Sequence, residues 1–240
     1  MKIFKLSIFL ILIISCSDKK TEHRISEFDK VLGNDNVATL DLLTSDFEND
    51  FLKRQYPNLN TEKAYQKFLT DLRDGKTDNW QSVSKKARKT FKSSELRLEM
   101  YEFPDSVWIL ENSTFDKIES DSLNYMHSRV PYIKSRFRYI NQDGTTEYTY
   151  SRSSIEFTPN PDYDSIINRE LITPEVNYIG KYLQALKSIK DKSEFHKEYY
   201  ERKSNAGFLP SESTSQFMLY KNIDLNDKLN RGIIVLEFIY

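Results

Sequence analysis

The chain has 240 residues, 30% of them charged, yet its formal net charge is only −1. This balance excludes a dedicated nucleic-acid-binding protein, because that class carries a basic excess. The one cysteine, Cys16, excludes an internal disulfide. Stability must come from packing, for which 15 Phe, 15 Tyr and 2 Trp supply large apolar side chains.

The first residues, MKIFKLSIFLILIISCSDKK, have the composition of an export signal. Lys2 and Lys5 form a short basic start, and residues 6–14 are apolar apart from Ser7. A membrane-spanning helix needs about 20 apolar residues, so this run is too short to cross a bilayer comfortably. The pattern predicts a secretory signal rather than a transmembrane helix.

The segment Ile13-Ile14-Ser15-Cys16 resembles the lipobox of bacterial lipoproteins, which has an apolar residue three positions before the cysteine and a small residue just before it. The resemblance implies diacylglyceryl transfer to the Cys16 thiol, cleavage before Cys16 and acylation of the new amine. Residues 1–15 are then the signal peptide and 16–24 a lipidated tether. Two other interpretations remain: an ordinary cleavage site at Ser15-x-Ser17, or an uncleaved segment that anchors poorly.

The resemblance also implies a location. Two or more acyl chains anchor a protein stably, and a mature lipoprotein of this type carries three. If Cys16 is acylated, no free thiol remains for nucleophilic, redox or metal chemistry. In the best-known Gram-negative sorting rule, Asp directly after the cysteine retains the protein in the inner membrane, and Ser17 holds that place here. We therefore expect the lipid anchor to bind this protein to a membrane of the cell envelope. The expected membrane is the outer membrane.

Three helices are predicted in the N-terminal part, over 36–56, over 60–74 and within 79–100. Apolar residues recur at helical spacing in the first two, and Pro57 and Gly75 are their stop signals. The buried positions expected there are Leu40, Leu43, Phe47, Phe51, Ala64, Phe68 and Leu72.

Strands are predicted after Pro104. Residues 107–110 read as one strand, and residues 132–140 alternate, with Ile133, Phe137 and Tyr139 on one face and Lys134, Arg136 and Arg138 on the other. Asp143-Gly144 is a favoured two-residue hairpin turn. A hairpin folded about it sets Tyr139 opposite Tyr148 and Phe137 opposite Tyr150.

Helices are expected again from Thr173, as cap, and Pro174, with Val176, Ile179, Leu183 and Leu186 facing inward, and from Asp191 to about Lys203. Residues 205–215 are interpreted as a Ser-rich loop. The apolar, β-branched segment 232–240 predicts a central strand. The fold class is thus α+β over residues 25–240: a helical N-terminal part followed by an antiparallel sheet with flanking helices, with a separate helical subdomain over 25–103 as the alternative.

Motifs for metal and cofactor chemistry are weak or missing. The histidines His23, His127 and His196 have no convincing second ligand at helical spacing. Asn222-x-Asp224-x-Asn226 and Asp162-x-Asp164 begin like calcium loops but are more typical of turns. The six glycines are isolated, Ser82-x-x-Lys85 lacks its partner motifs, and no G-x-S-x-G occurs. We therefore assign no catalytic, metal or cofactor-binding residue, and lipidation of Cys16 is the one site predicted.

Three surface features have two interpretations each. The basic run from Lys85 to Lys92 is more typical of a solvated helix face than of a lipid or glycan contact. The cationic face of residues 132–140 either binds anions or protects an edge strand, and edge protection is preferred. Glu198-Tyr199-Tyr200 offers rings to a sugar, but Tyr199 four residues after Phe195 favours a core stripe.

These observations predict a membrane-anchored cell-envelope lipoprotein that binds or scaffolds a partner without catalysis. The expected partner is an envelope protein or glycan, not a nucleic acid. Two alternatives remain: a surface hydrolase acting on glycan or peptide, because paired carboxylates need no local motif, and an inhibitor or immunity-type lipoprotein.

Overall fold

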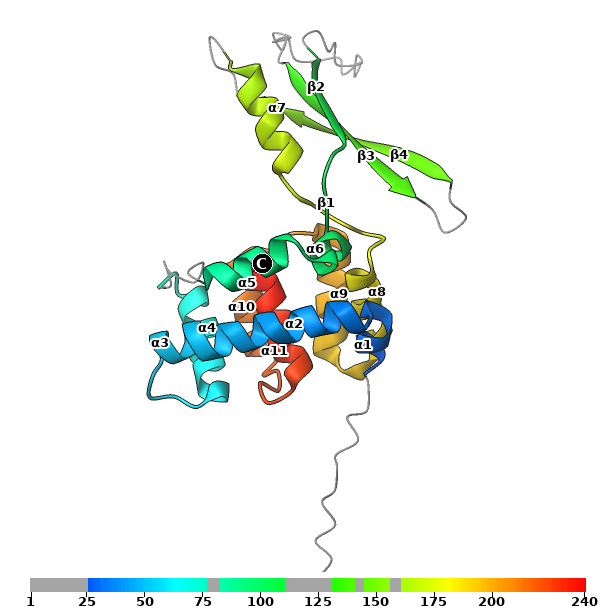
Figure 1. The fold of residues 1–240 in the computed structure, drawn as a ribbon. Helices are drawn as coiled ribbons and strands as arrows, with labels where there is room; N and C mark the ends of the chain where they lie inside the picture. Colours follow the sequence, from blue (N-terminus) through cyan, green and yellow to red (C-terminus); the bar gives the residue numbers. More distant parts are fainter. Residues whose placement is uncertain (1–25, 77–82, 111–130, 141–144, 156–160) are drawn as a thin grey trace, which may run out of the picture.

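A computed structural model describes residues 26–76, 83–110, 131–140, 145–155 and 161–240. The predicted lipidation site Cys16, the histidines His23 and His127, Ser82 and the Asp143-Gly144 turn lie outside the described residues. Figure 1 shows two parts, one built of helices and one of a small sheet with a helix. We call them the helical body, the described residues of 26–100 and 177–240, and the sheet module, those of 103–174.

The N-terminal half of the helical body has a helix wherever the sequence predicts one. Ser26 and Asp29 form a capping box at the start of the first helix, and Asn60 accepts a hydrogen bond from the Lys63 backbone N–H at the start of α4. The predicted helices over 36–56 and 60–74 are confirmed, and the segment within 79–100 holds two helices instead of one. The elements are α1 (Glu27–Leu32), α2 (Asn34–Asp46), the π-helical η1 (Phe47–Leu52), α3 (Lys53–Gln55), α4 (Thr61–Arg73), α5 (Lys85–Lys92) and α6 (Glu95–Met100).

The C-terminal half adds α8 (Lys181–Ser188), η2 (Lys190–Lys192), α9 (Glu194–Ala206), α10 (Ser211–Tyr220) and α11 (Lys228–Phe238). These helices share one hydrophobic core with the N-terminal ones. Phe68 of α4, for example, meets Phe47 and Phe51 of η1 and Phe238 of α11 edge to face. The helical part of the fold is therefore not confined to residues 25–103.

The predicted central strand over 232–240 is wrong, because this segment forms most of α11. Its four residues Ile233 to Leu236 are at most 1% exposed, so the helix is enclosed on all sides. A helix buried all round and a strand buried on both faces have the same continuous apolar pattern. Packing decides the outcome here: Gly232 lets the helix approach the side chain of Leu40.

Two other predicted boundaries are wrong. Thr173 ends α7 (Tyr163–Ile172) instead of starting a helix. The next helix, α8, begins only after Gly180. Ile179 is therefore exposed, whereas Leu183 and Leu186 are buried as predicted. The expected loop over 205–215 contains the first residues of α10, whereas the predicted end of α9 at 205–207 is confirmed. Pro210 precedes α10, and serine-rich composition concealed the helix.

The sheet module contains three antiparallel strands in the order β2 (Ser106–Leu110), β3 (Tyr132–Ile140) and β4 (Thr146–Ser154). The predicted strands over 107–110 and 132–140 are confirmed. Helix α7 packs against β2, and Ser135 of β3 donates a hydrogen bond to Glu170 of α7. Ile133 and Phe137 are buried on this same side, which we call the inner face. Together with the helical body, this sheet confirms the α+β fold class.

The register of the β3–β4 hairpin differs by one residue from the predicted one. Arg138 lies opposite Tyr148 and Arg136 opposite Tyr150, whereas Phe137 lies opposite Thr149. A shift of one residue moves every side chain of a strand to the other face. Both tyrosines therefore lie on the cationic side of the sheet, where contacts between rings and cations stabilise this register. Edge protection is also wrong for this face, because β3 is the central strand.

The two parts are joined by a narrow neck. Strand β1 (Tyr101–Glu102) enters the sheet module, β5 (Glu175–Val176) leaves it, and the two pair antiparallel. Beside them, the Asn177 side chain donates to the carbonyl of Leu98 at 2.8 Å. A Cβ on Gly180 would lie 2.1 Å from the carbonyl oxygen of Glu99, so only glycine allows this close approach.

Candidate functional site

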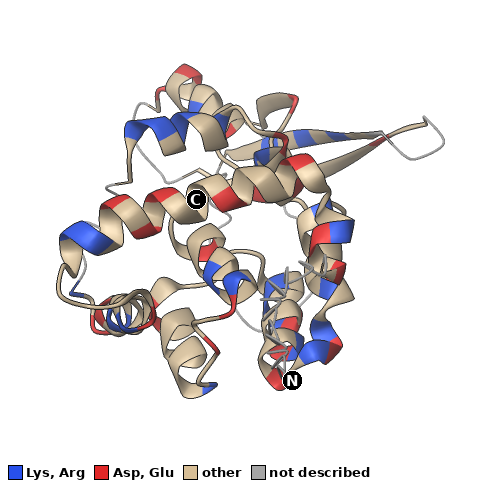
Figure 2. Ribbon diagram, turned by 60° about the horizontal axis from the view of Figure 1, so that its bottom comes forward, with Lys and Arg blue, Asp and Glu red and all other residues tan. Residues whose placement is uncertain are grey.

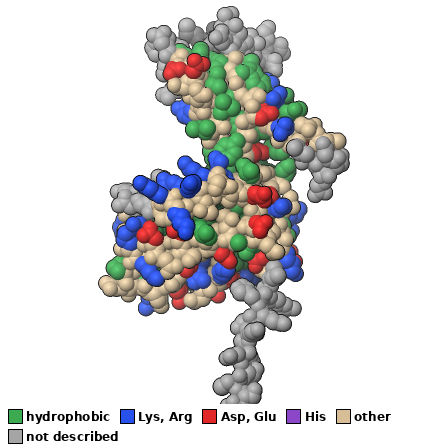
Figure 3. Space-filling view, viewed as in Figure 1, with side chains coloured by type: hydrophobic (Ala, Val, Ile, Leu, Met, Phe, Trp, Pro, Cys, Tyr) green, Lys and Arg blue, Asp and Glu red, His purple; other side chains and the backbone are tan. Residues whose placement is uncertain are grey.

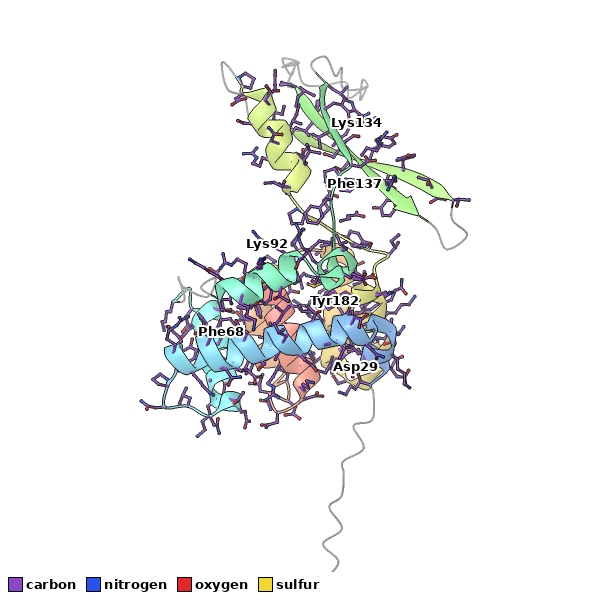
Figure 4. The ribbon with its side chains drawn as sticks, in the orientation of Figure 1. Asp29, Phe68, Lys92, Lys134, Phe137 and Tyr182 are labelled. Carbon is purple, nitrogen blue, oxygen red and sulfur yellow. The ribbon has the colours of Figure 1, made fainter. Side chains whose placement is uncertain are left out.

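The candidate site is the side of the sheet turned away from α7, which we call the outer face. The pairing places a cation and a ring, or two cations, beside each other in successive rows: Trp108, Lys134 and Arg152 in one, Arg136 and Tyr150 in the next, Arg138 and Tyr148 in the third. In Figure 4, Lys134 and Phe137 mark the outer and inner faces of β3. Figure 2 shows basic residues along the projecting hairpin.

The rings and cations of the outer face contact each other. The Lys134 ammonium lies 4.5 Å from the centroid of the Tyr150 ring and 5.5 Å from that of Trp108. These two rings meet nearly edge to face at 6.2 Å, so the lysine head is held between them. The Arg136 guanidinium carbon lies 4.8 Å from the centroid of Tyr148. Each contact contributes about 0.5–1 kcal/mol at an exposed site and orients the cation.

The outer face is cationic because only part of its charge is neutralised. Arg136 forms a two-pronged ion pair with Asp105, Nε–Oδ1 2.9 Å and Nη2–Oδ2 3.1 Å, which lowers the pKa of that carboxyl. Within the described residues, no carboxylate lies within ion-pair distance of Lys134, Arg138 or Arg152. Among the described residues, three cations outside any ion pair thus lie beside three aromatic rings.

Exposure makes this face accessible to a ligand. Tyr148 is 47% and Tyr150 53% exposed, although both are large aromatic residues. Flat rings offer an apolar surface, and ammonium and guanidinium groups bind carboxylates or phosphates. Such a face suits a ligand that combines acidic groups with apolar ring faces. The sequence had indicated the cations, but the one-residue error in register placed the tyrosines on the other face.

A buried charge cluster lies inside the helical body. The Lys203 ammonium is 2.9 Å from Glu237 Oε2, with both side chains at most 5% exposed. The Tyr199 hydroxyl donates to the same oxygen at 2.5 Å and lies 3.5 Å from the Tyr182 hydroxyl. Burial, and then the charge of Glu237, raise the pKa of both tyrosines. The cluster is closed to solvent, so its role is structural.

His196, which had no predicted partner, is the third residue of α9. Its Nδ1 lies 2.7 Å from the Oγ of Ser193, the cap of that helix, and burial followed by the charge of Lys192 lowers its pKa. It borders a hollow of about 370 Å³. The acid beside it, Asp227, is already bound to Lys192 and to the Leu229 backbone N–H. The arrangement is that of a capped helix start.

The remaining residues singled out in the sequence have ordinary structural roles. Asp162 caps α7, and Asp224 accepts a hydrogen bond from Asn226 in a turn. Tyr199 is fully buried against Phe195, which confirms the core stripe. The basic residues of α5 lie on the exposed side of that helix, where Figure 3 shows them gathered. No group of three or more His, Cys, Asp or Glu residues fit for a metal ion occurs in the described ranges.

Comparisons with known proteins give no relative: no family model, no curated protein and no solved structure matches this chain. Among the helices that the structure describes, none has both the length and the apolar character needed to cross a membrane.

Proposed function

We propose that this protein is a lipid-anchored binding protein of the bacterial cell envelope whose outer face binds an anionic glycan. Two independent observations support the proposal. The segment ending at Cys16 resembles a lipobox, which implies a triacylated anchor. The outer face presents aromatic rings together with cations that form no ion pair among the described residues.

The placement of Lys134 between Tyr150 and Trp108 is the observation that carries the binding role. Solubility does not require a lysine to contact two aromatic rings. Two ring contacts fix the position of the Lys134 ammonium, which favours binding of an acidic group. The rings beside it offer flat surfaces for the apolar face of a sugar. Glycans rich in uronic acid or phosphate combine both features.

The test uses the lipoprotein purified from membranes in mild detergent and titrated with alginate, a uronic acid polymer, and with dextran as the neutral polymer. Alginate is expected to bind, with affinity that falls as salt rises because the contact is partly ionic. Lys134→Ala and Tyr150→Ala should each weaken binding about 5–10-fold, which corresponds to about 1 kcal/mol. Tyr220→Ala is the matched control, since Tyr220 is 82% exposed on α10.

Equal binding of dextran and alginate, or unchanged binding after both substitutions in the outer face, would contradict the glycan proposal. The anchor has a separate test, the mass of the mature N-terminus. Triacylated Cys16 is the expected result, and an unmodified chain beginning at Asp18 contradicts it. The two results are independent, so the failure of one proposal is distinguishable from the failure of the other.

A further inference from the structure

Strand β4 is the edge of the sheet over its full nine residues, Thr146–Ser154. The Asp105 N–H donates to the carbonyl of Arg136, so even-numbered residues of β3 direct their backbone groups toward β2. The Ile155 N–H donates to the carbonyl of Pro131, so odd-numbered residues join β3 to β4. The backbone groups of the even-numbered residues of β4 therefore point away from the sheet.

This edge is open. The Tyr150 ring leans across β3 toward Trp108, and the Tyr148 ring leans over Arg136 instead of its direct neighbour Arg138. Both rings thus incline toward the sheet and leave the outer backbone edge clear. The strand contains no Pro or Lys, and its register against β3 has no bulge. Proline, lysine and bulges are devices by which proteins prevent edge strands from pairing, and β4 has none of the three.

We propose that β4 pairs antiparallel with β4 of a second copy of this chain, with Tyr150 of each copy on the two-fold axis. The residues with outward backbone groups then face one another: Tyr150 opposite Tyr150, Tyr148 opposite Arg152, and Thr146 opposite Ser154. All nine residues take part, and the two three-stranded sheets become one continuous sheet of six strands. The interface is self-complementary, as a two-fold contact requires.

The number of paired residues selects this register, because an axis centred on Thr149 or Ser151 pairs only seven residues of β4 instead of nine. Each Arg152 lies opposite a Tyr148 of the other copy, so a cation and an aromatic residue are cross-strand neighbours twice across the axis. The one carboxylate of the strand, Glu147, lies opposite Ser153, so no like charges face each other. Centring the pair on Arg152 instead places two guanidinium groups opposite each other, which destabilises it. Centring it on Tyr148 pairs only 146–150 within β4.

The inference goes beyond glycan binding and does not depend on it. Side chains of the outer face stand roughly perpendicular to the sheet, so edge pairing leaves them exposed. The dimer joins the two outer faces into one surface of doubled length.

The test is disulfide cross-linking of the full-length lipoprotein in its own membranes, with a mild oxidant. Residues in a hydrogen-bonded antiparallel pair have Cα atoms about 5.5 Å apart, within disulfide range. Tyr150→Cys should therefore give a band at twice the monomer mass. Tyr148→Cys and Arg152→Cys should each give none alone and a dimer when co-expressed. Wild type, with Cys16 only, sets the background, and Tyr220→Cys is the control for random collision.

The positions are half exposed or exposed, so these substitutions should leave the fold and the amount of protein in the membrane unchanged. A Tyr150→Cys dimer no more abundant than the Tyr220→Cys dimer would overturn the proposal. So would a product at another mass, which indicates a different protein on the edge, or efficient self-cross-linking of Tyr148→Cys, which indicates a different register.

Discussion

Replacing Lys203 with Met tests the role assigned to the buried ion pair. The change removes the ammonium 2.9 Å from Glu237 and keeps most of the side-chain volume. Glu237 is then a buried carboxylate that keeps only the hydrogen bond from Tyr199. Removal of one partner from a buried pair costs about 3–5 kcal/mol of unfolding free energy.

The effect is large enough to measure by heat or urea. In a protein of this size, 1 kcal/mol shifts the melting temperature by about 2–4 °C, so Lys203→Met should lower it by about 6–20 °C. The double variant Lys203→Met/Glu237→Leu should be more stable than the sum of the two single changes, because no unpaired charge remains. Lys187→Met, at an exposed position of α8, is the control and should change stability by no more than about 0.5 kcal/mol. A loss below about 1 kcal/mol in Lys203→Met, or strict additivity in the double variant, refutes the reasoning.

Two further predictions concern stability. Burial and then the charge of Lys192 lower the pKa of His196 in the folded protein. The unfolded chain therefore binds a proton on this imidazole at a higher pH than the folded chain does. The free energy of unfolding should fall as the pH drops below about 6.5. His196→Gln should reduce that loss in urea unfolding at pH 7 and pH 5.5, and an identical pH dependence would argue against it. Gly180→Ala should destabilise by about 1–3 kcal/mol, because its Cβ meets the backbone carbonyl of Glu99. Lys187→Ala, at an exposed position of α8, should change stability by no more than about 0.5 kcal/mol in the same unfolding assay, and a loss as large as that of Gly180→Ala would contradict this account.

Helices with clear periodicity and caps were predictable from the sequence. The stripe of Ala64, Phe68 and Leu72 with Asn60 before it leaves little choice, and the structure has α4 there. The segment 232–240 was not predictable in this way, since an unbroken apolar run fits a buried strand and a buried helix equally. Only the surrounding core, with Leu40 against Gly232, decides for the helix.

The binding surface was half predictable. Alternation along β3 identified Lys134, Arg136 and Arg138 as one face. The tyrosines of β4 depended on the length of the hairpin connection, and Asp143-Gly144 favoured a two-residue turn. The observed pairing of Ile140 with Thr146 leaves five residues between them, which moves Tyr148 and Tyr150 to the cationic face. Contacts between strands, not the turn residues, set this register.

Binding of the anionic polymer to the outer face is the central claim, and one titration tests it most directly. Alginate is added to the wild-type lipoprotein and to Tyr150→Ala at the same low salt concentration. The account predicts an affinity about 5–10-fold weaker for Tyr150→Ala, with Tyr220→Ala like wild type. Equal affinities for wild type and Tyr150→Ala would contradict it.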